Sequence, residues 1–260
     1  MNSTQKALMK SEYDYFHSGS HNRKTFAGEI SVTPNFELLA SGCVLHNIRE
    51  SDISEDFESW LNAIEVEFRK IGTSLCRFYF SQQSEAQNKI LMDRGYDKVT
   101  EIGLAVNLDS LKSINSSKGE LKPILDNGGW KLKKTLYKAA KLGPDGHNMK
   151  DGAFSDFEKV KCDAGYMISF LYWKDNKPIG AVSLAIKDEF SRLKNLLVHP
   201  DYRGQGIGSE IVMALTKEAK SLGSKTFGVY AVENMNSHKL YLGCGMKEVL
   251  RHTEWSKELK

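Results

Sequence analysis

The sequence predicts an α/β (α+β) protein whose C-terminal half forms a mixed sheet flanked by helices. Residues 166–198 contain three β-rich segments separated by short turns, which is typical of antiparallel strands. After them, helical and β-rich patterns alternate to the end of the chain, which is typical of β–α–β units. A weak internal repeat, at a shift of 150–151 residues, predicts a second unit of the same kind in the N-terminal half.

The predicted elements of the C-terminal half are two helices, three strands, a helix, a strand, a short helix and a last strand. The third helix is the most regular, because Ile211, Val212, Leu215, Ala219 and Leu222 are apolar and share one face. In chain order the elements cover Trp130–Leu142, Phe154–Val160, Tyr166–Trp173, Ile179–Ile186, Ser191–Val198, Ser209–Leu222, Thr226–Val232, Ser237–Leu242 and the residues after Gly245.

Two segments have the composition of linkers or loops. Residues 109–120 are rich in Ser, Asn and Lys without apolar periodicity, so they predict a domain boundary. Residues 143–152 are rich in Gly, Pro and Asp and predict a loop inside the second domain. We therefore expect one domain over residues 1–108, a linker over 109–124 and a second domain over 125–260.

The composition is ordinary for a soluble globular protein, since 40% of the 260 residues are hydrophobic and 27% are charged. No apolar run approaches the roughly 20 residues that span a bilayer, and the N-terminus lacks the apolar region of a signal peptide. We therefore expect a cytoplasmic protein with no membrane partner. The four cysteines and seven histidines show no metal-ligand spacing, so the sequence predicts free thiols and no metal site.

Charge is distributed unevenly along the chain. Residues 1–106 contain 11 Lys and Arg against 15 Asp and Glu, whereas the remainder contains 25 against 18. A basic half suits a polyanionic ligand, either a nucleic acid or a phosphorylated cofactor. The basic residues are not interleaved with aromatic residues and form no recognition-module signature, so we expect no nucleic acid partner.

A glycine-rich loop, Arg203-Gly204-Gln205-Gly206-Ile207-Gly208-Ser209, lies between a predicted strand and a predicted helix. Glycines let the backbone turn sharply, and the first amides of the helix point outward unpaired at the positive end of its dipole. With the charge of Arg203, the loop predicts a pyrophosphate site. It lacks the third glycine of a dinucleotide fingerprint and the Gly-Lys-Ser/Thr of a Walker loop. The alternative is a glycine-rich turn beside a solvated arginine.

A second motif follows the predicted strand Thr226–Val232. Asn234 comes where this strand ends, at the edge of the sheet where open α/β sheets bind ligands. Tyr241 follows about two helical turns later and faces the same edge, and Gly245 suits a left-handed helix stop. The alternative for Tyr241 is a packed aromatic side chain on a short helix.

Together the two motifs resemble those of the GNAT acetyltransferase family. The loop is similar to the family's Q/R-x-x-G-x-G/A motif, and it follows a strand that ends Leu-Val-His-Pro. Asn234, Ser237, Tyr241 and Gly245-Met246 match the family's later motif, except that methionine stands where an aromatic residue is usual. The resemblance covers residues 165–250 and implies a GNAT-like mixed sheet, with 125–165 forming two helices on the substrate side.

The resemblance also implies a site for acetyl-CoA. The pantetheine arm would lie between the strands that end at Val198 and Val232. It would pair with the main chain of Leu196, Leu197 and Val198, and it would contact Asn234, Ser237 and Tyr241. The pyrophosphate would bind to Arg203, Gly204, Gln205, Gly206, Ile207, Gly208 and Ser209. Tyr241 would donate a proton to the departing thiolate after direct attack by a neutral amine.

The general base is the weakest part of the resemblance. Family members often carry a carboxylate on the strand before the phosphate loop, but residues 191–195 contain none. Glu233, Asp188 and Glu189 are the candidates, with Glu233 preferred, and a water chain to solvent is the alternative.

The internal repeat predicts that the N-terminal half has lost the site. Residues 52–57, which align with the phosphate loop, contain three carboxylates and no glycine, and Leu91 stands where the C-terminal half has Tyr241. We therefore expect residues 1–108 to be a degenerate, non-catalytic GNAT-like domain. A chance similarity of an unrelated α/β domain is the alternative. The remaining aligned pairs are 55–71 with 209–222, Leu75–Phe80 with Thr226–Val232, Ser84 with Asn234, Gly95-Tyr96 with Gly245-Met246, and Leu45-His46 with Leu196-Leu197.

We expect an N-acetyltransferase that uses acetyl-CoA, without a metal, to acetylate an amine of a small molecule or peptide. Arg192 and Lys194 share one face of their strand and suggest an acceptor with a carboxylate or phosphate, although exposed basic residues usually have no such role. The alternative function is a non-catalytic protein that binds or senses acyl-CoA, which the missing strand carboxylate favours.

Overall fold

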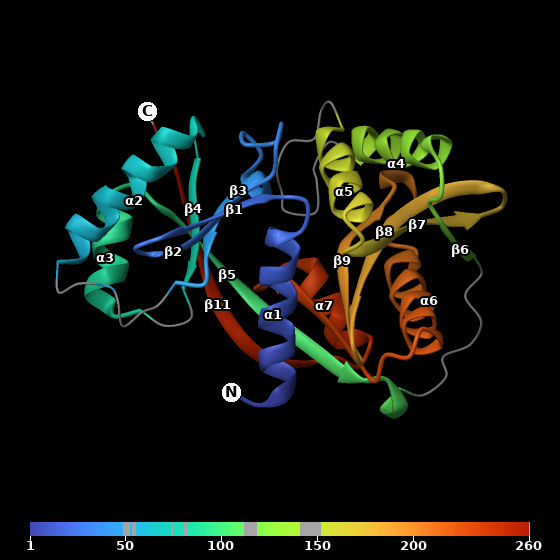
Figure 1. Cartoon of the computed structure of the whole chain (residues 1–260). Helices are drawn as coiled ribbons and strands as arrows, with labels where there is room; N and C mark the ends of the chain where they lie inside the picture. The colour runs from blue at the N-terminus through green and yellow to red at the C-terminus, as the bar shows by residue number, and fades with distance from the viewer. Residues whose placement is uncertain are drawn as a thin grey trace. The chain divides into compact units, whose positions relative to one another are not determined.

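A computed structural model of the chain describes residues 1–48, 53, 56–73, 75–80, 83–111, 119–140 and 152–259. The chain folds into two compact units. Unit 1 consists of Met1–Ser11 and Gly103–Leu250, and unit 2 consists of Glu12–Ile102 and Arg251–Lys260. Each unit contains strands flanked by helices, which confirms the predicted α/β class (Figure 1).

Unit 1 carries the strand order β5-β10-β9-β8-β7-β6. Its three central strands β7, β8 and β9 are antiparallel, as predicted, and β10 pairs parallel with β9. The elements are β5 (Asp97–Asn107), η3 (Leu108–Ser110), β6 (Glu120–Pro123), α4 (Asn127–Ala140), α5 (Ala153–Asp163), β7 (Met167–Lys174), β8 (Lys177–Lys187), β9 (Phe190–Val198), η4 (Pro200–Tyr202), α6 (Ile207–Ser221), β10 (Thr226–Val232), α7 (Asn236–Gly243) and β11 (Lys247–Glu258), preceded by α1 (Ser3–His17).

Helices cover both faces of the sheet in unit 1 (Figure 1). On β7, the hydroxyl of Ser169 accepts a hydrogen bond from Lys133 of α4 at 2.6 Å, and the hydroxyl of Tyr172 donates to Glu210 of α6 at 2.6 Å. Because residues three apart on a strand point to opposite faces, α4 and α6 lie on opposite sides. The sheet that contains β9 is therefore covered by α4 on one face and by α6 on the other.

Most of the predicted apolar face of α6 is confirmed. Ile211, Val212, Leu215 and Ala219 are buried, but Leu222 is 45% exposed. The prediction for Leu222 is wrong because α6 ends at Ser221, and Leu222 is the C-cap residue where the chain leaves the helix axis.

The predicted linker over residues 109–124 contains a strand. Glu120–Pro123 forms β6 and pairs antiparallel with Phe170–Trp173 of β7. Residues 112–118 of that linker and 143–151 of the predicted loop lie outside the described residues. A four-residue strand with alternating polar residues carries too little apolar pattern to be recognised in sequence.

Unit 2 carries the strand order β1-β2-β3-β4-β11. Its core is rich in aromatic side chains, among them Trp60, Phe68, Phe78 and Trp255, which are all buried. The elements are β1 (His21–Thr25), β2 (Gly28–Val32), η1 (Ala40–Gly42), β3 (Cys43–His46), α2 (Phe57–Ile71), β4 (Leu75–Phe80), α3 (Glu85–Asp93) and the second half of β11.

The two units do not coincide with the predicted domains 1–108 and 125–260. The end of β11 belongs to unit 2, because residues 253–258 pair with β4 and Glu254 forms a buried ion pair with Arg77 at 2.6 Å. The first residues of α1 belong to unit 1, where Leu8 packs against Gly103 and Gly228. These exchanges of segments depend on pairings between distant parts of the chain, which a local composition shift cannot reveal.

The two units share the helix stop that the internal repeat predicts. Gly95 and Gly245 lie 150 residues apart and have left-handed φ angles of 80° and 87°. Each donates its N–H to the carbonyl three residues before it, Met92 at 2.9 Å and Leu242 at 3.0 Å. Residues 52, 54 and 55 of the aligned loop lie outside the described residues. That unit 2 is a degenerate, non-catalytic copy stays a prediction.

The described residues contain no helix with the length and apolar character needed to cross a membrane. The four cysteines are free, as predicted, and Cys43, Cys76 and Cys244 are buried. The cytoplasmic location stays a prediction.

Candidate functional site

The predicted phosphate loop connects the end of β9 to the start of α6. Gly204 and Gly206 have left-handed φ angles of 73° and 80°, a conformation that glycine adopts without steric cost. Gly206 is the N-cap residue of α6 and offers no side-chain cap, so the first amides of the helix are left for another acceptor. This is the backbone arrangement that binds phosphate groups at helix N-termini.

The side chains of the loop help to hold its shape. The Nε atom of Arg203 donates a hydrogen bond to the carbonyl of Val198 at 3.1 Å, and the amide of Gln205 donates to the carbonyl of Asp201 at 3.0 Å. Arg203 and Gln205 are otherwise exposed. The guanidinium charge is therefore kept beside the last residue of β9, next to the helix start.

The strands β9 and β10 pair for only part of their length. The parallel pairing joins Phe190–Arg192 to Thr226–Gly228 and extends no further along these two described strands. Asn195 has a left-handed φ of 58° and lies where the register between β8 and β9 shifts, which makes a β-bulge. The residues after this bulge, Leu196–Val198, thus have no partner on β10 and offer backbone groups to an extended ligand.

The second predicted motif lies at the same edge of the sheet. Because β9 and β10 are parallel, the residues that follow β10 lie at the edge where β9 ends. Glu233 is half-buried, Asn234 is exposed with a left-handed φ of 63°, and Ser237 is half-buried at the start of α7. The binding roles expected of Glu233, Asn234 and Ser237 remain predictions.

The helix α7 packs directly against the start of α6. A Cβ on Gly208 would lie 3.2 Å from Leu240, so only glycine fits this contact without a shift of the neighbouring side chain. The hydroxyl of Ser209 forms a hydrogen bond with the thiol of Cys244. The phosphate loop and the residues around Tyr241 therefore form one packed structure.

Tyr241 is buried, with 4% of its surface exposed. Burial raises the pKa of its phenol, and the nearby thiol of Cys244 adds to this shift. The phenol is therefore protonated at neutral pH, as a general acid must be. The same burial is what a packed aromatic residue shows, so burial alone does not distinguish the two interpretations.

Two of the three candidate bases lie at the wrong end of the sheet. Asp188 and Glu189 form the turn between β8 and β9, and the carbonyl of Glu189 accepts hydrogen bonds from the N–H groups of Lys225 and Thr226. At about 3.3 Å per residue, this turn is roughly 30 Å from Val198 along the strand. Asp188 and Glu189 therefore lie far from the phosphate loop, whereas Glu233 follows β10 at the same edge of the sheet as the loop.

Arg192 and Lys194 have less solvent contact than their residue types suggest. Arg192 is 1% exposed, and its guanidinium lies 4.8 Å from the centre of the Tyr230 ring. Lys161 of α5 is fully buried, and burial, with the charge of Lys194 as a smaller cause, lowers its pKa to about 7. Sequence analysis missed Lys161, since a lysine on a short amphipathic helix gives no sign of burial.

A buried polar network, also missed in the sequence, supports the bulge in β9. Lys133 of α4 and Glu158 of α5 form an ion pair at 2.8 Å, and both side chains are 0% exposed. Glu158 also accepts hydrogen bonds from Tyr137, Ser183 and Asn195 at 2.7, 3.0 and 2.8 Å. The bond from Asn195 ties the bulge, and so the geometry of the residues after it, to the two helices.

Comparison with known proteins agrees with this fold. Residues 136–246 match the model of the acetyltransferase (GNAT) family. A structurally similar protein of unknown function from Staphylococcus epidermidis has a TM-score of 0.73 at 14% identity, covering 94% of this chain and 96% of that chain. A GCN5-related N-acetyltransferase from Kribbella flavida has a TM-score of 0.64 at 10% identity, covering 96% and 94%.

A tandem GNAT protein from the clavulanic acid biosynthesis pathway has a TM-score of 0.58 at 11% identity and covers 89% of this chain and 79% of that chain. At such identities these likenesses show a shared fold. The family match covers the antiparallel strands, the phosphate loop and the second motif. Residues 136–246 therefore match the acetyltransferase (GNAT) family model, which confirms the resemblance found in the sequence.

Proposed function

We propose that the protein is an N-acetyltransferase that transfers the acetyl group of acetyl-CoA to an amine of a small molecule or peptide. The observation that carries this proposal is the end of β9 that does not pair with β10, residues Leu196–Val198, beside the start of α6, which has no side-chain cap. An extended amide-bearing arm pairs naturally with such a strand edge, and a pyrophosphate binds naturally to such a helix start. The strand edge and the helix start lie next to each other, in the same order as the pantetheine arm and the pyrophosphate of acyl-CoA.

In the proposed complex, residues 203–209 bind the pyrophosphate through backbone amides and the guanidinium of Arg203. The main chain of Leu196–Val198 and the side chains of Asn234 and Ser237 orient the pantetheine arm. Supporting this, Arg203 is held at the end of β9 by its bond to Val198. The site thus fixes the thioester near Tyr241 on α7.

The proposed reaction is a direct transfer within a ternary complex. Glu233, or water beside it, accepts a proton from the acceptor amine, whose nitrogen forms a bond to the thioester carbonyl carbon. The carbon–sulfur bond then breaks, and Tyr241 donates its proton to the sulfur. Two products leave, an N-acetyl amide and the free thiol, and no covalent enzyme intermediate forms.

The first test is calorimetric titration of acetyl-CoA into the full chain and two charge-reversal variants. Arg203→Glu alters the phosphate loop, and Lys217→Glu is the matched control, because Lys217 is exposed further along the same helix. Replacing a charge-assisted hydrogen bond by a repulsive charge costs at least ~1.5 kcal/mol, which is about tenfold in affinity. We expect one site per chain, weakened at least about tenfold by Arg203→Glu and unchanged by Lys217→Glu.

Each other outcome contradicts a stated part of the proposal. No binding by the wild type removes the proposed function. Two acetyl-CoA sites per chain show that the N-terminal half is not the non-catalytic copy expected from residues 52–57. Equal weakening by both variants shows that the general charge of the molecule, and not the loop, sets the affinity.

A second function, acyl-CoA binding or sensing without turnover, is favoured by one observation. The strand β9 carries no carboxylate over residues 191–195, where a general base would face the thioester. Acetyl-CoA binding at one site without acetylation of any amine in a broad acceptor screen would favour this second function.

A further inference from the structure

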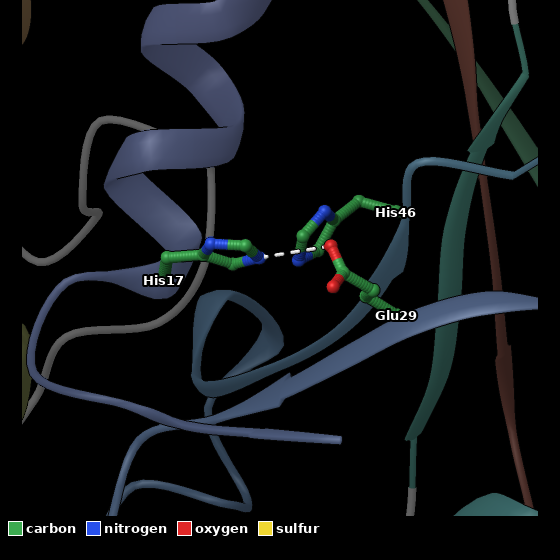
Figure 2. Close-up of side chains that lie close together, drawn as sticks. All are labelled: His17, Glu29 and His46. Carbon is green, nitrogen blue, oxygen red and sulfur yellow. Dashed lines mark ion pairs between the residues drawn. The ribbon is translucent and has the colours of Figure 1, made fainter. Parts of the chain in front are cut away.

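Two histidines and a glutamate converge in unit 2, far from the acetyl-CoA motifs in sequence. His17 is the last residue of α1, Glu29 lies on β2 and His46 is the last residue of β3. Figure 2 shows the three side chains directed toward one another from these separate elements. One potential ligand atom from each lies within 4.8 Å of the others.

The distances within this His–Glu–His cluster are close to those of a metal centre. The Nε2 atom of His17 lies 3.3 Å from Oε2 of Glu29. Ligand atoms held at ~2.0–2.1 Å from Zn²⁺ in a tetrahedral arrangement lie roughly 3.4 Å apart. The His17–Glu29 pair therefore already has the required separation, and the ligand atom of His46 lies within 4.8 Å of both.

A chain of hydrogen bonds determines which nitrogen of His46 carries its proton. Asn22 donates its amide to the carbonyls of His17 and Ser20 at 3.2 and 3.3 Å, so its oxygen is directed to Ser31. The hydroxyl of Ser31 donates to that oxygen at 2.6 Å and must therefore accept from Nε2–H of His46 at 2.7 Å. The neutral ring then carries its free lone pair at Nδ1.

Both histidines have a buried nitrogen without a hydrogen bond. Among the described residues, Nδ1 of His46 makes no hydrogen bond, and Nε2 of His17 has only its ion-pair contact with Glu29, although both nitrogen atoms are shielded from solvent. A buried imidazole nitrogen normally has a partner, because leaving it unsatisfied costs the free energy of its lost hydration. A cation held beside the Glu29 carboxylate supplies such a partner to Nε2 of His17.

The surroundings of His46 resemble the outer shell of a metal site. A metal-bound histidine usually donates its other N–H to a polar group, and here that group is the hydroxyl of Ser31. The rings of Tyr13 and Phe16 stack on His46 at centroid distances of 5.4 and 5.6 Å, which limits its rotation. On the open side, the His17 side chain is 36% exposed, so an ion can reach the cluster from solvent.

We propose that His17, Glu29 and His46 bind one divalent transition-metal ion of the zinc type. Two imidazole nitrogens and one carboxylate oxygen are a ligand set that Zn²⁺ accepts, with the fourth position left to water. The hard cations Mg²⁺ and Ca²⁺ prefer all-oxygen sites, so this set selects against them. Within unit 2, the ion joins the end of α1 to β2 and β3.

The proposal is tested on the full chain after removal of metal with a chelator. ZnCl₂ is titrated calorimetrically into the wild type and into His17→Gln, Glu29→Gln and the matched control His21→Gln. His21 is an exposed histidine on β1, four residues from His17 and outside the cluster. We expect one Zn²⁺ per chain in the wild type and the control, and at least about tenfold weaker binding in the other two variants.

Folding and selectivity are checked by separate measurements. His17 and Glu29 are partly exposed, with side-chain exposures of 36% and 19%, so their variants are expected to fold with an unchanged circular dichroism spectrum. Zn²⁺ is expected to raise the Tm of the wild type and of His21→Gln only. MgCl₂ at the same concentration is expected to give no heat.

Three outcomes overturn the proposal. The first is no Zn²⁺ binding by the wild type. The second is equal Zn²⁺ affinity in the wild type, His17→Gln and Glu29→Gln, which assigns any binding to other groups such as the thiols. The third is a loss of Zn²⁺ affinity in His21→Gln as large as that in His17→Gln, which shows that binding is a property of surface histidines. None of these outcomes depends on acetyl-CoA, so they are independent of the proposed transferase function.

Discussion

Substitution of the buried Glu158 by glutamine is expected to destabilise unit 1 strongly. The carboxylate of Glu158 forms an ion pair with the ammonium group of Lys133 at 2.8 Å, and both side chains are fully buried. The substitution keeps the size of the side chain but removes its charge. The ammonium group of Lys133 then remains inside the protein without a counter-charge.

The magnitude follows from the contacts that are lost. The two carboxylate oxygens of Glu158 accept from four donors, on Lys133, Tyr137, Ser183 and Asn195. A glutamine has only one acceptor oxygen. Its amide nitrogen is a hydrogen-bond donor, so two of the four donors lose their acceptor. Removing one partner of a buried ion pair typically costs 3–5 kcal/mol, and we expect ~4 kcal/mol here.

The assay is equilibrium unfolding in urea, followed by circular dichroism, with two comparison variants. Glu120→Gln removes an exposed partner of Lys122 and is expected to cost less than ~0.5 kcal/mol. Lys133→Met combined with Glu158→Gln is expected to recover ~2 kcal/mol of the single-variant loss, because no uncompensated charge stays buried. The reasoning is refuted if Glu158→Gln costs under ~1 kcal/mol, or if the double variant is no more stable than Glu158→Gln.

Two further predictions concern titration and catalysis. Burial lowers the pKa of Lys161 to about 7, so between pH 7 and 10.5 the unfolded chain binds more protons than the folded chain, and the free energy of unfolding rises with pH. The assay is urea unfolding of the wild type and Lys161→Met at pH 7.5 and 9.5. The free energy of unfolding of the wild type should be ~2 kcal/mol higher at pH 9.5 than at pH 7.5, and Lys161→Met should lack this gain. The same pH dependence in both proteins would contradict the buried position of the ammonium group. Tyr241→Phe should lower kcat for acetylation by roughly 10²–10⁴-fold while leaving the Kd of acetyl-CoA unchanged, and an unaltered kcat would leave Tyr241 as a packing residue only.

Local patterns predicted much of unit 1 correctly. The strand Thr226–Val232 has the predicted bounds, and α6 begins two residues before its predicted start. These elements were predictable because apolar spacing and glycine positions act over a few residues, within one helix turn or one strand. The phosphate loop was found for the same reason, since its glycines, its arginine and its helix start are contiguous in sequence.

The network around Glu158 was not predictable from the sequence. Its members come from α4, α5, β7, β8 and β9, and each alone is a polar residue of unremarkable spacing. The cluster of His17, Glu29 and His46 is similar, and its wide spacing led to the expectation of no metal site. Side chains brought together from distant elements leave no periodic signal in the chain.

The sequence by itself determined the class of the fold, the order of elements in unit 1 and the two GNAT motifs, because each of these depends on contiguous residues. Only the tertiary structure decided which segments complete each unit, which candidate base lies at the correct end of β9, and which charged residues are buried. Those features depend on pairing between segments that are far apart in the sequence, such as Arg77 and Glu254, which are 177 residues apart. Local composition does not reveal such pairings. The free energy that selects them is a sum over all the contacts of the packed structure, and no single segment of the chain determines it.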